Sequence, residues 1–172
     1  MKRTLFYAFA ALALISFTGC DDEKESDDLN SEAQYVDLAL PSGTLWCSVD
    51  ESGYYTYDEA VEKYGEKLPT KAQFQELIDE CTWQFDGKKT FKVIGKNDKY
   101  ITLVGAGYKE EGELWDDGSW NIWTRTSRGD NNAWYFYGDS YEGDDEPEYE
   151  MDYIEKEYGH RVRLVQTPVG EK

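Results

Sequence analysis

The chain has 172 residues, with 36 acidic and 18 basic side chains and a formal net charge of −18. So acidic a chain repels phosphate backbones and anionic headgroups, which excludes nucleic-acid binding and weighs against sulfated polysaccharides as ligands. Neutral or cationic partners are favoured, and the length fits one domain with a substantial core.

The N-terminus has the pattern of a lipoprotein signal. Two basic residues precede thirteen mostly apolar ones, Leu5 to Phe17, and Cys20 follows closely. Thirteen residues are too few to span a bilayer, which takes about 20. The pattern predicts a signal peptide at residues 1–19 and a lipid on the Cys20 thiol that attaches the chain to a membrane. A cleaved soluble signal peptide is the alternative.

Residues 20–33 predict an acidic tether. The run from Asp21 to Asp28 is dominated by carboxylates and has no apolar side chain to bury, so we expect it to be solvated. An acidic stretch directly after a lipidated cysteine resembles the surface-export signal of Bacteroidetes lipoproteins. That resemblance implies a lipid anchor in the outer membrane with the domain at the cell surface. A plain acidic spacer is the alternative.

Two strands open the folded part of the chain. Alternation of apolar and polar residues indicates strands over Tyr35–Leu40 and Thr44–Val49. On the second strand Cys47 shares a face with Leu45 and Val49, and this places its thiol on a buried side.

Two helices follow. A short one is predicted over Tyr57–Tyr64. The stronger signal covers Lys71–Glu80, because Thr70 and Gln73 form a capping-box pattern at its start. Apolar residues at helical spacing continue to Cys81, so this thiol faces the core from the end of the helix.

The cysteines suggest one disulfide. With Cys20 carrying lipid, Cys47 and Cys81 are the two that remain, and outside the cytoplasm such a pair is a candidate for a bridge. The closed loop would span 35 residues and stabilise the fold by about 4 kcal/mol in the chain-entropy model. Two separate buried thiols are the alternative.

The second half of the chain predicts short strands. They are expected at Phe91–Ile94, Tyr100–Val104, Ile122–Thr126, Ala133–Tyr137, Tyr153–Glu157 and Arg161–Val165. Helices early and many short antiparallel strands later indicate a single α+β domain, which we place at residues 34–168.

Several short blocks of sequence resemble a known family. They are Tyr35 to Leu38, Leu40 to Trp46, Leu68 to Thr70, Glu76-Leu77, Ile122 to Thr126 and Val162 to Val165. In order and spacing they resemble the Fibrobacter major paralogous domain, and they are similar to the C-terminal domain of Legionella collagen-like proteins. The resemblance covers about residues 34–167. It implies a C-type-lectin-like fold, with one or two helices packed on short antiparallel strands and a long loop region that binds glycans or proteins.

Two departures limit the chemistry that the resemblance implies. Glu146-Pro147-Glu148 is similar to the sugar-chelating loop of calcium-dependent lectins, but no Trp-Asn-Asp follows it. Formylglycine-generating enzymes, which share this fold class, need reactive cysteines near the C-terminus, whereas the last cysteine here is Cys81. We therefore expect neither calcium-mediated sugar chelation nor that enzyme activity.

The segment 139–152 holds eight acidic side chains and no basic one. It lacks the spacing of an EF-hand, so we expect a solvated acidic loop and no cofactor. Calcium is the alternative, with candidate ligands Asp144, Asp145, Glu146 and Glu148. The same loop is the candidate contact for a basic protein partner.

The candidate ligand site lies where aromatic residues crowd between residues 115 and 137. Aromatic faces stack on the C–H surfaces of sugars, while carboxylates and amides bind the hydroxyls. The loop 107–120 and the turn 128–132 supply the candidates Trp115, Asp116, Asp117, Trp120, Asp130, Asn131 and Asn132. Trp123 and Trp134 fall within predicted strands, and we expect them in the core.

No catalytic motif is evident. His160 is the only histidine and has no second His or Cys nearby, which favours a structural role over a metal site. No nucleophile motif is present. The sequence thus predicts a non-catalytic surface module that binds a neutral glycan. A protein-interaction component of the cell envelope is the alternative, and a hydrolase that uses two of the carboxylates is the third hypothesis.

Overall fold

The computed structural model describes residues 34–140 and 147–168. Contacts divide the chain after residue 30, and every described element belongs to the unit that begins at Ser31. The predicted signal peptide, Cys20 and the tether lie outside the described residues. None of the helices within the described ranges is long and apolar enough to cross a membrane.

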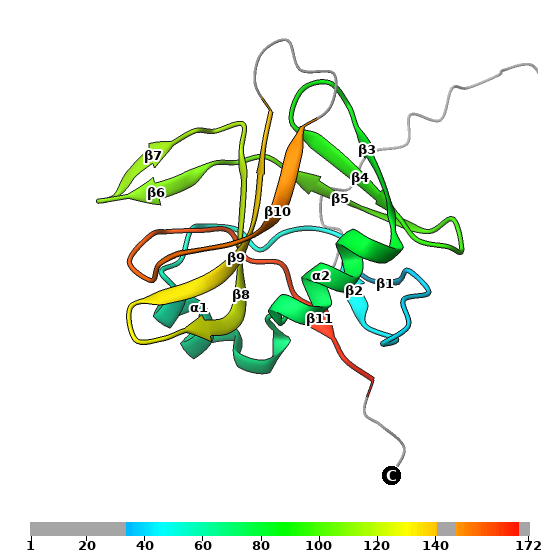
Figure 1. Ribbon diagram of the computed structural model, residues 1–172, viewed down its shortest axis with the longest axis horizontal. Helices are drawn as coiled ribbons and strands as arrows, with labels where there is room; N and C mark the ends of the chain where they lie inside the picture. Colours follow the sequence, from blue (N-terminus) through cyan, green and yellow to red (C-terminus); the bar gives the residue numbers. More distant parts are fainter. Residues whose placement is uncertain (1–33, 141–146, 169–172) are drawn as a thin grey trace, which may run out of the picture. The chain divides into compact units, whose positions relative to one another are not determined.

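The fold is α+β, with two short α-helices and small antiparallel sheets (Figure 1). This confirms the predicted class. In chain order the elements are β1 (Tyr35–Asp37), β2 (Leu45–Cys47), α1 (Tyr57–Tyr64), a 3-10 turn (Gly65–Lys67), α2 (Lys71–Glu80), β3 (Thr82–Phe85), β4 (Thr90–Ile94), β5 (Tyr100–Val104), β6 (Tyr108–Glu110), β7 (Glu113–Trp115), β8 (Trp120–Arg128), β9 (Asn132–Asp139), β10 (Glu148–Glu155) and β11 (Val165–Gln166).

Both helices have the predicted bounds, and both begin with a capping box. Thr56 and Glu59 form it in α1, and Thr70 and Gln73 form it in α2. In each box the threonine hydroxyl accepts a hydrogen bond from the backbone of the third helical residue, whose own side chain accepts one from the threonine backbone. Gly65 ends α1 with a φ of 52°, a conformation that glycine adopts at little cost.

Three three-stranded sheets and one hairpin build the β part of the described chain. Both β1 and β11 pair with β2, so the first and last described strands lie in one sheet. The other sheets have the orders β3–β4–β5 and β8–β9–β10, and β6 pairs with β7. Helix α2 packs against β8, β9 and β10.

The core consists of two clusters. The first includes Trp46, Phe74 and Phe136, and the second is centred on Trp123. Strand β2 contributes to both, because successive side chains of a strand point to opposite faces: Trp46 enters the first cluster and Cys47 the second. The prediction that Cys47 lies on a buried side is confirmed, and Trp46 on the opposite face is buried as well.

The acidic segment 139–152 is partly a strand, which corrects the prediction of a loop. Its second half begins β10, and β10 pairs with β9 along its length. Glu148 and Glu150 are exposed, while Tyr149 and Met151, which alternate with them, pack against the first cluster. This alternation stabilises a strand despite the charge, because the acidic residues share the solvated side.

Cys47 and Cys81 are free thiols in the structure, which does not contain the predicted disulfide. Cys47 is buried in the second cluster, whereas Cys81 follows α2 and packs against the first. The helical spacing correctly predicted that Cys81 faces the core. The cluster that Cys81 contacts is the first one, whereas Cys47 belongs to the second.

We expect the folded protein to protect Cys81 from alkylation. Its burial, with Glu80 and Glu76 nearby, raises the pKa of the thiol from 9.0 to about 11. Since the thiolate is the reactive form, a shift of this size slows modification near pH 8 by roughly 100-fold. Iodoacetamide labelling of a Cys47→Ser variant, read by mass spectrometry, measures the rate. The unfolded wild-type chain should label at both positions, and failure of both to label there would instead favour a bridge.

Candidate functional site

The structure separates the two tryptophans that the sequence placed together. Trp120 is 1% exposed, packs 4.3 Å from the Phe91 ring centroid, and donates its indole N–H to the Leu103 carbonyl at 3.1 Å. The prediction of Trp120 as a ligand contact was therefore wrong. A turn in which the Ser119 backbone donates to the Asp116 carbonyl directs the chain back into the core. Trp115 lies before that turn and is 49% exposed.

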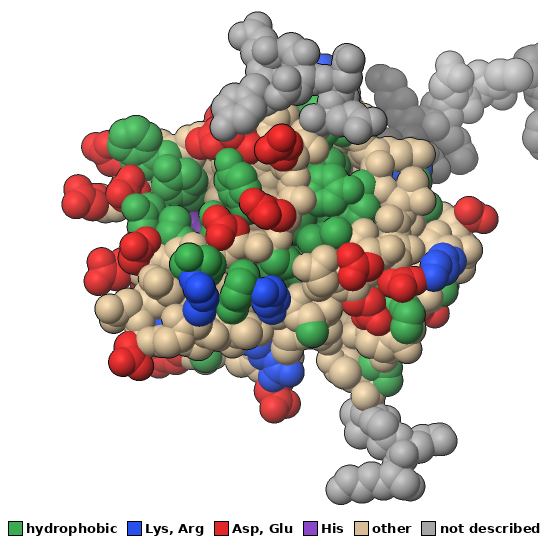
Figure 2. Space-filling view, viewed as in Figure 1, with side chains coloured by type: hydrophobic (Ala, Val, Ile, Leu, Met, Phe, Trp, Pro, Cys, Tyr) green, Lys and Arg blue, Asp and Glu red, His purple; other side chains and the backbone are tan. Residues whose placement is uncertain are grey.

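Trp115 lies on a β-hairpin, β6–β7, where the sequence predicted a loop. In this hairpin Tyr108 is opposite Trp115, and Glu110 is opposite Glu113. Directly opposed residues of an antiparallel pair project to the same face, so these four side chains share one face. Leu114 projects from the other face and is also half exposed. Figure 2 shows apolar side chains flanked by acidic ones over this hairpin.

The Trp115 face of the hairpin is the face that meets Tyr158. The ring centroids of Tyr108 and Tyr158 lie 5.8 Å apart, and the Tyr158 hydroxyl donates to the Glu110 carboxylate at 3.0 Å. This hydrogen bond raises the pKa of Tyr158. Backbone hydrogen bonds in both directions between Lys109 and Gly159 fix the segment before His160 against β6.

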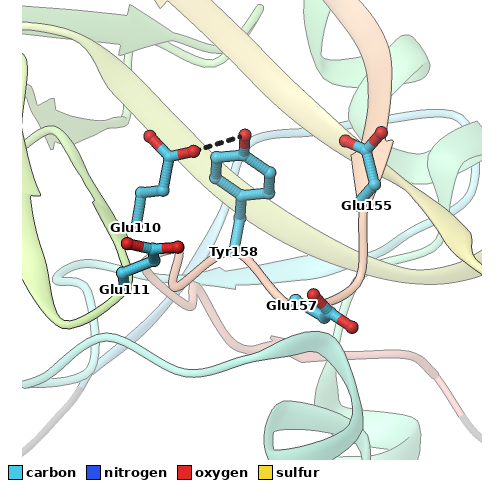
Figure 3. Close-up of a pocket in the computed structure, with 5 residues that line it drawn as sticks. All are labelled: Glu110, Glu111, Glu155, Glu157 and Tyr158. Atoms are coloured by element: carbon cyan, nitrogen blue, oxygen red, sulfur yellow. Dashed lines mark hydrogen bonds between the residues drawn. The ribbon is translucent and has the colours of Figure 1, made fainter.

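An acidic pocket of about 260 Å³ lies between this hairpin and the end of β10. Figure 3 shows Tyr158 between two pairs of carboxylates. The lining consists of Glu110, Glu111, Glu155, Glu157 and Tyr158, which we call the acidic pocket. Because its lining includes no lysine or arginine, its charge suits a cation or a ligand rich in hydrogen-bond donors.

Asp116 joins this surface electrostatically. Its φ of 47° is unusual for a residue other than glycine, and partial burial raises the pKa of its carboxyl, with smaller effects from Asp139 and Asp117. Burial, then Glu110 and Asp116, likewise raise the pKa of Tyr108. Asp116 is therefore close enough to influence the Tyr108 phenol, and the next residue, Asp117, is exposed as Asp116 is.

The predicted turn lies at a second pocket of about 390 Å³. Its lining is Asp58, Asp130, Asn131, Glu155, Lys156 and Glu157. Lys156 lies over this turn and donates to the Asp130 carbonyl at 2.9 Å. Asn132, by contrast, is a half-buried residue at the start of β9. Because Glu155 and Glu157 line both pockets, the pockets are neighbours, but Trp115 lines neither.

His160 lies buried among aromatic rings. Its ring stacks on Trp123 at 4.2 Å between centroids, and Tyr135 lies 4.6 Å away. Tyr108 and Tyr158 complete the surroundings. Desolvation lowers the pKa of His160 to about 3, so the imidazole is neutral across the physiological range. This burial agrees with the structural role expected from the sequence.

The calcium alternative falls mostly outside the described residues. Asp144, Asp145 and Glu146 lie there, and Glu148 is an exposed residue at the start of β10. Within the described ranges no group of three or more His, Cys, Asp or Glu side chains is arranged to hold a metal ion.

Comparison with protein-family models, with curated proteins and with solved structures gave no match.

Proposed function

We propose that this chain is a non-catalytic binding module, anchored by a lipid on Cys20 in the outer membrane and displayed at the cell surface. The proposed localisation rests on the sequence pattern at residues 1–33. The ligand that we propose is a neutral glycan. The observation that carries this proposal is the half-exposed Trp115 ring on the same hairpin face as Tyr108 and Glu110.

The hairpin face combines the groups that a sugar needs. The exposed Trp115 ring offers an apolar platform for the C–H face of a pyranose. Glu110 and Asp116 are acceptors for sugar hydroxyls, and the Tyr108 phenol is both a donor and an acceptor. Such a site binds through stacking and hydrogen bonds, so it requires no metal ion.

The fold that we propose is C-type-lectin-like. Two features support it beside the sequence blocks. Both helices precede most of the strands, and β1 and β11 pair with β2 so that the two ends of the domain meet. Trp46, Leu68 and Val165, from three of the blocks, are buried in the core.

We expect Trp115→Ala to weaken glycan binding by about tenfold or more, because truncating a central aromatic contact typically costs more than 1 kcal/mol. The measurement is a glycan-array screen of the chain without residues 1–19 and with Cys20→Ser, run with calcium and again with EDTA, followed by titration of the hits. Leu114→Ala is the matched control, because this neighbour is equally exposed on the opposite hairpin face.

Retention of full affinity by Trp115→Ala would refute this site. Binding that is lost in EDTA would instead favour the calcium alternative at Asp144, Asp145, Glu146 and Glu148.

A basic protein partner is the second candidate function, and the acidic pocket favours it. The lining of this pocket has four carboxylates and no basic side chain to neutralise them. It therefore suits a lysine or arginine side chain supplied by another protein. Two results together would support this function over the first. The array would give no glycan hits, and polylysine would capture the protein in a way that added salt and the Glu155→Gln substitution both weaken.

A further inference from the structure

Cations and aromatic rings alternate on the face of β8–β9–β10 that carries α2. The Lys71 ammonium lies 3.1 Å from the centroid of the Trp134 ring. The guanidinium carbon of Arg128 lies 3.2 Å from the centroid of Tyr153 and 5.5 Å from that of Trp134. We call these four residues the cation ladder. Figure 2 shows blue and green side chains alternating over this sheet.

The sheet register explains why the ladder forms. Trp134 on β9 is directly opposite Tyr153 on β10, and their ring centroids lie 5.5 Å apart. Trp134 is thus only partly buried, not a core residue as the sequence predicted. Lys71 is brought to the ring because its backbone N–H, at the start of α2, donates to the Thr126 hydroxyl on β8.

The two charges of the ladder have no acidic partner among the described residues. The ion pairs within those ranges are Lys96–Glu80 and Arg163–Asp50. The same part of the chain also provides no hydrogen-bond acceptor for the side chains of Lys71 and Arg128. In a chain with a net charge of −18, two adjacent unpaired cations make a local basic surface that the overall charge conceals.

Stacking on a ring orients a guanidinium group without using its donors. The ring covers the flat face of Arg128, and the N–H groups project from the edge of the guanidinium plane. Two of these N–H groups match the two oxygens of a carboxylate, and Lys71 adds a second charge nearby. Because the ring already restricts the long side chain, binding loses less side-chain entropy.

We propose that the cation ladder binds the carboxylate of a uronic acid residue in an acidic glycan. The site is distinct from the Trp115 surface and does not depend on the proposed function there. An acidic peptide is the competing ligand, but it brings several clustered charges towards a strongly negative protein. A uronic acid carries one carboxylate beside several hydroxyls. Its C–H face fits the ring of Tyr153, a residue that is 41% exposed.

NMR titration of the chain without residues 1–19 and with Cys20→Ser tests this proposal, with glucuronate as the probe and glucose as its uncharged match. We expect glucuronate to shift the Trp134 indole and Arg128 Nε–H signals, with a Kd on the order of 1–10 mM, and glucose to leave them in place. Arg128→Gln or Lys71→Gln should weaken binding by about tenfold. Lys88→Gln removes the same charge from the exposed β3–β4 turn and should change affinity less than twofold, about 0.4 kcal/mol.

Absence of shifts with glucuronate, or equal affinity in both ladder variants and the wild type, would overturn the proposal. Equal or stronger shifts with a glutamate-containing peptide would overturn the assignment to a glycan. Arg128→Lys keeps the charge but loses the paired N–H donors, so we expect its affinity to lie between those of Arg128→Gln and the wild type. Wild-type affinity in Arg128→Lys would refute the contact of two N–H groups with one carboxylate.

Discussion

Arg163→Met is expected to destabilise the fold by about 3–5 kcal/mol, the cost of removing one partner from a buried ion pair. Arg163 is 1% exposed. Its guanidinium donates to the Asp50 carboxylate at 2.5 Å and to the backbone carbonyls of Cys47 and Thr102 at 2.6 Å each. Methionine fills a similar space but leaves the Asp50 side chain, itself 7% exposed, without a counter-charge. Urea denaturation measures the loss.

A double variant separates the buried charge from the lost packing. Replacing Asp50 by leucine in the Arg163→Met background removes the stranded carboxylate, so the double variant should be more stable than the single one. Lys96→Met is the matched control, because it breaks the exposed pair with Glu80 and should leave the unfolding midpoint unchanged. A single variant as stable as the wild type would contradict this account of the pair.

Local signals in the sequence were enough to predict both helices. The capping box of α2 needs only Thr70 and Gln73, which lie within one helical turn, and the apolar residues after it repeat at helical spacing. Strand β5 was also predicted with its observed bounds, Tyr100–Val104. The chemistry that decides these elements lies within a few neighbouring residues, so no knowledge of the tertiary fold is needed.

The exposure of individual tryptophans could not be predicted in the same way. Trp115 and Trp120 have similar acidic and glycine-rich neighbours, and only the return of the chain to the carbonyl of Leu103 makes Trp120 a core residue. Trp134 was expected in the core because it falls within a strand, yet it lies beyond the edge of the first cluster, where Lys71 covers it. Burial at these positions depends on contacts between residues far apart in sequence.

A hairpin signal at residues 108–115 was overlooked. Glu111 and Gly112 both have positive φ, 50° and 86°, as a two-residue turn of the I′ type requires. The usual signal for that turn is Asn-Gly or Asp-Gly, and glutamate at the first position obscures it. Recognition of this turn would have paired Tyr108 with Trp115 and located the candidate surface.

His160→Phe is expected to make the fold less sensitive to acid. The pKa of His160 is about 3 in the folded protein, against 6.5 for an unperturbed histidine. Between these values the unfolded chain binds a proton that the folded chain excludes, so stability falls as the pH drops from 6.5 towards 3. Each pH unit contributes about 1.4 kcal/mol, which gives roughly 3 kcal/mol between pH 7 and pH 4.5.

Phenylalanine suits this test because it keeps a flat ring against Trp123 while removing the titrating group. The wild type and the variant are compared by urea denaturation at pH 7 and pH 4.5. The neighbouring phenols of Tyr108, Tyr135 and Tyr158 stay protonated throughout, since the pKa of each is raised. The carboxylates of the acidic pocket are the same in both proteins, so their contribution cancels in the difference between the two pH dependences.

The same pH dependence in both proteins would contradict a neutral buried imidazole, as would an NMR titration of His160 near pH 6.5. Tyr108 and Tyr158 lie beside the imidazole, within 6.2 and 6.4 Å between ring centroids, so its protonation would disturb the rings that connect Trp115 to the acidic pocket. A histidine held neutral by its surroundings therefore keeps these rings in one arrangement between pH 4.5 and pH 7.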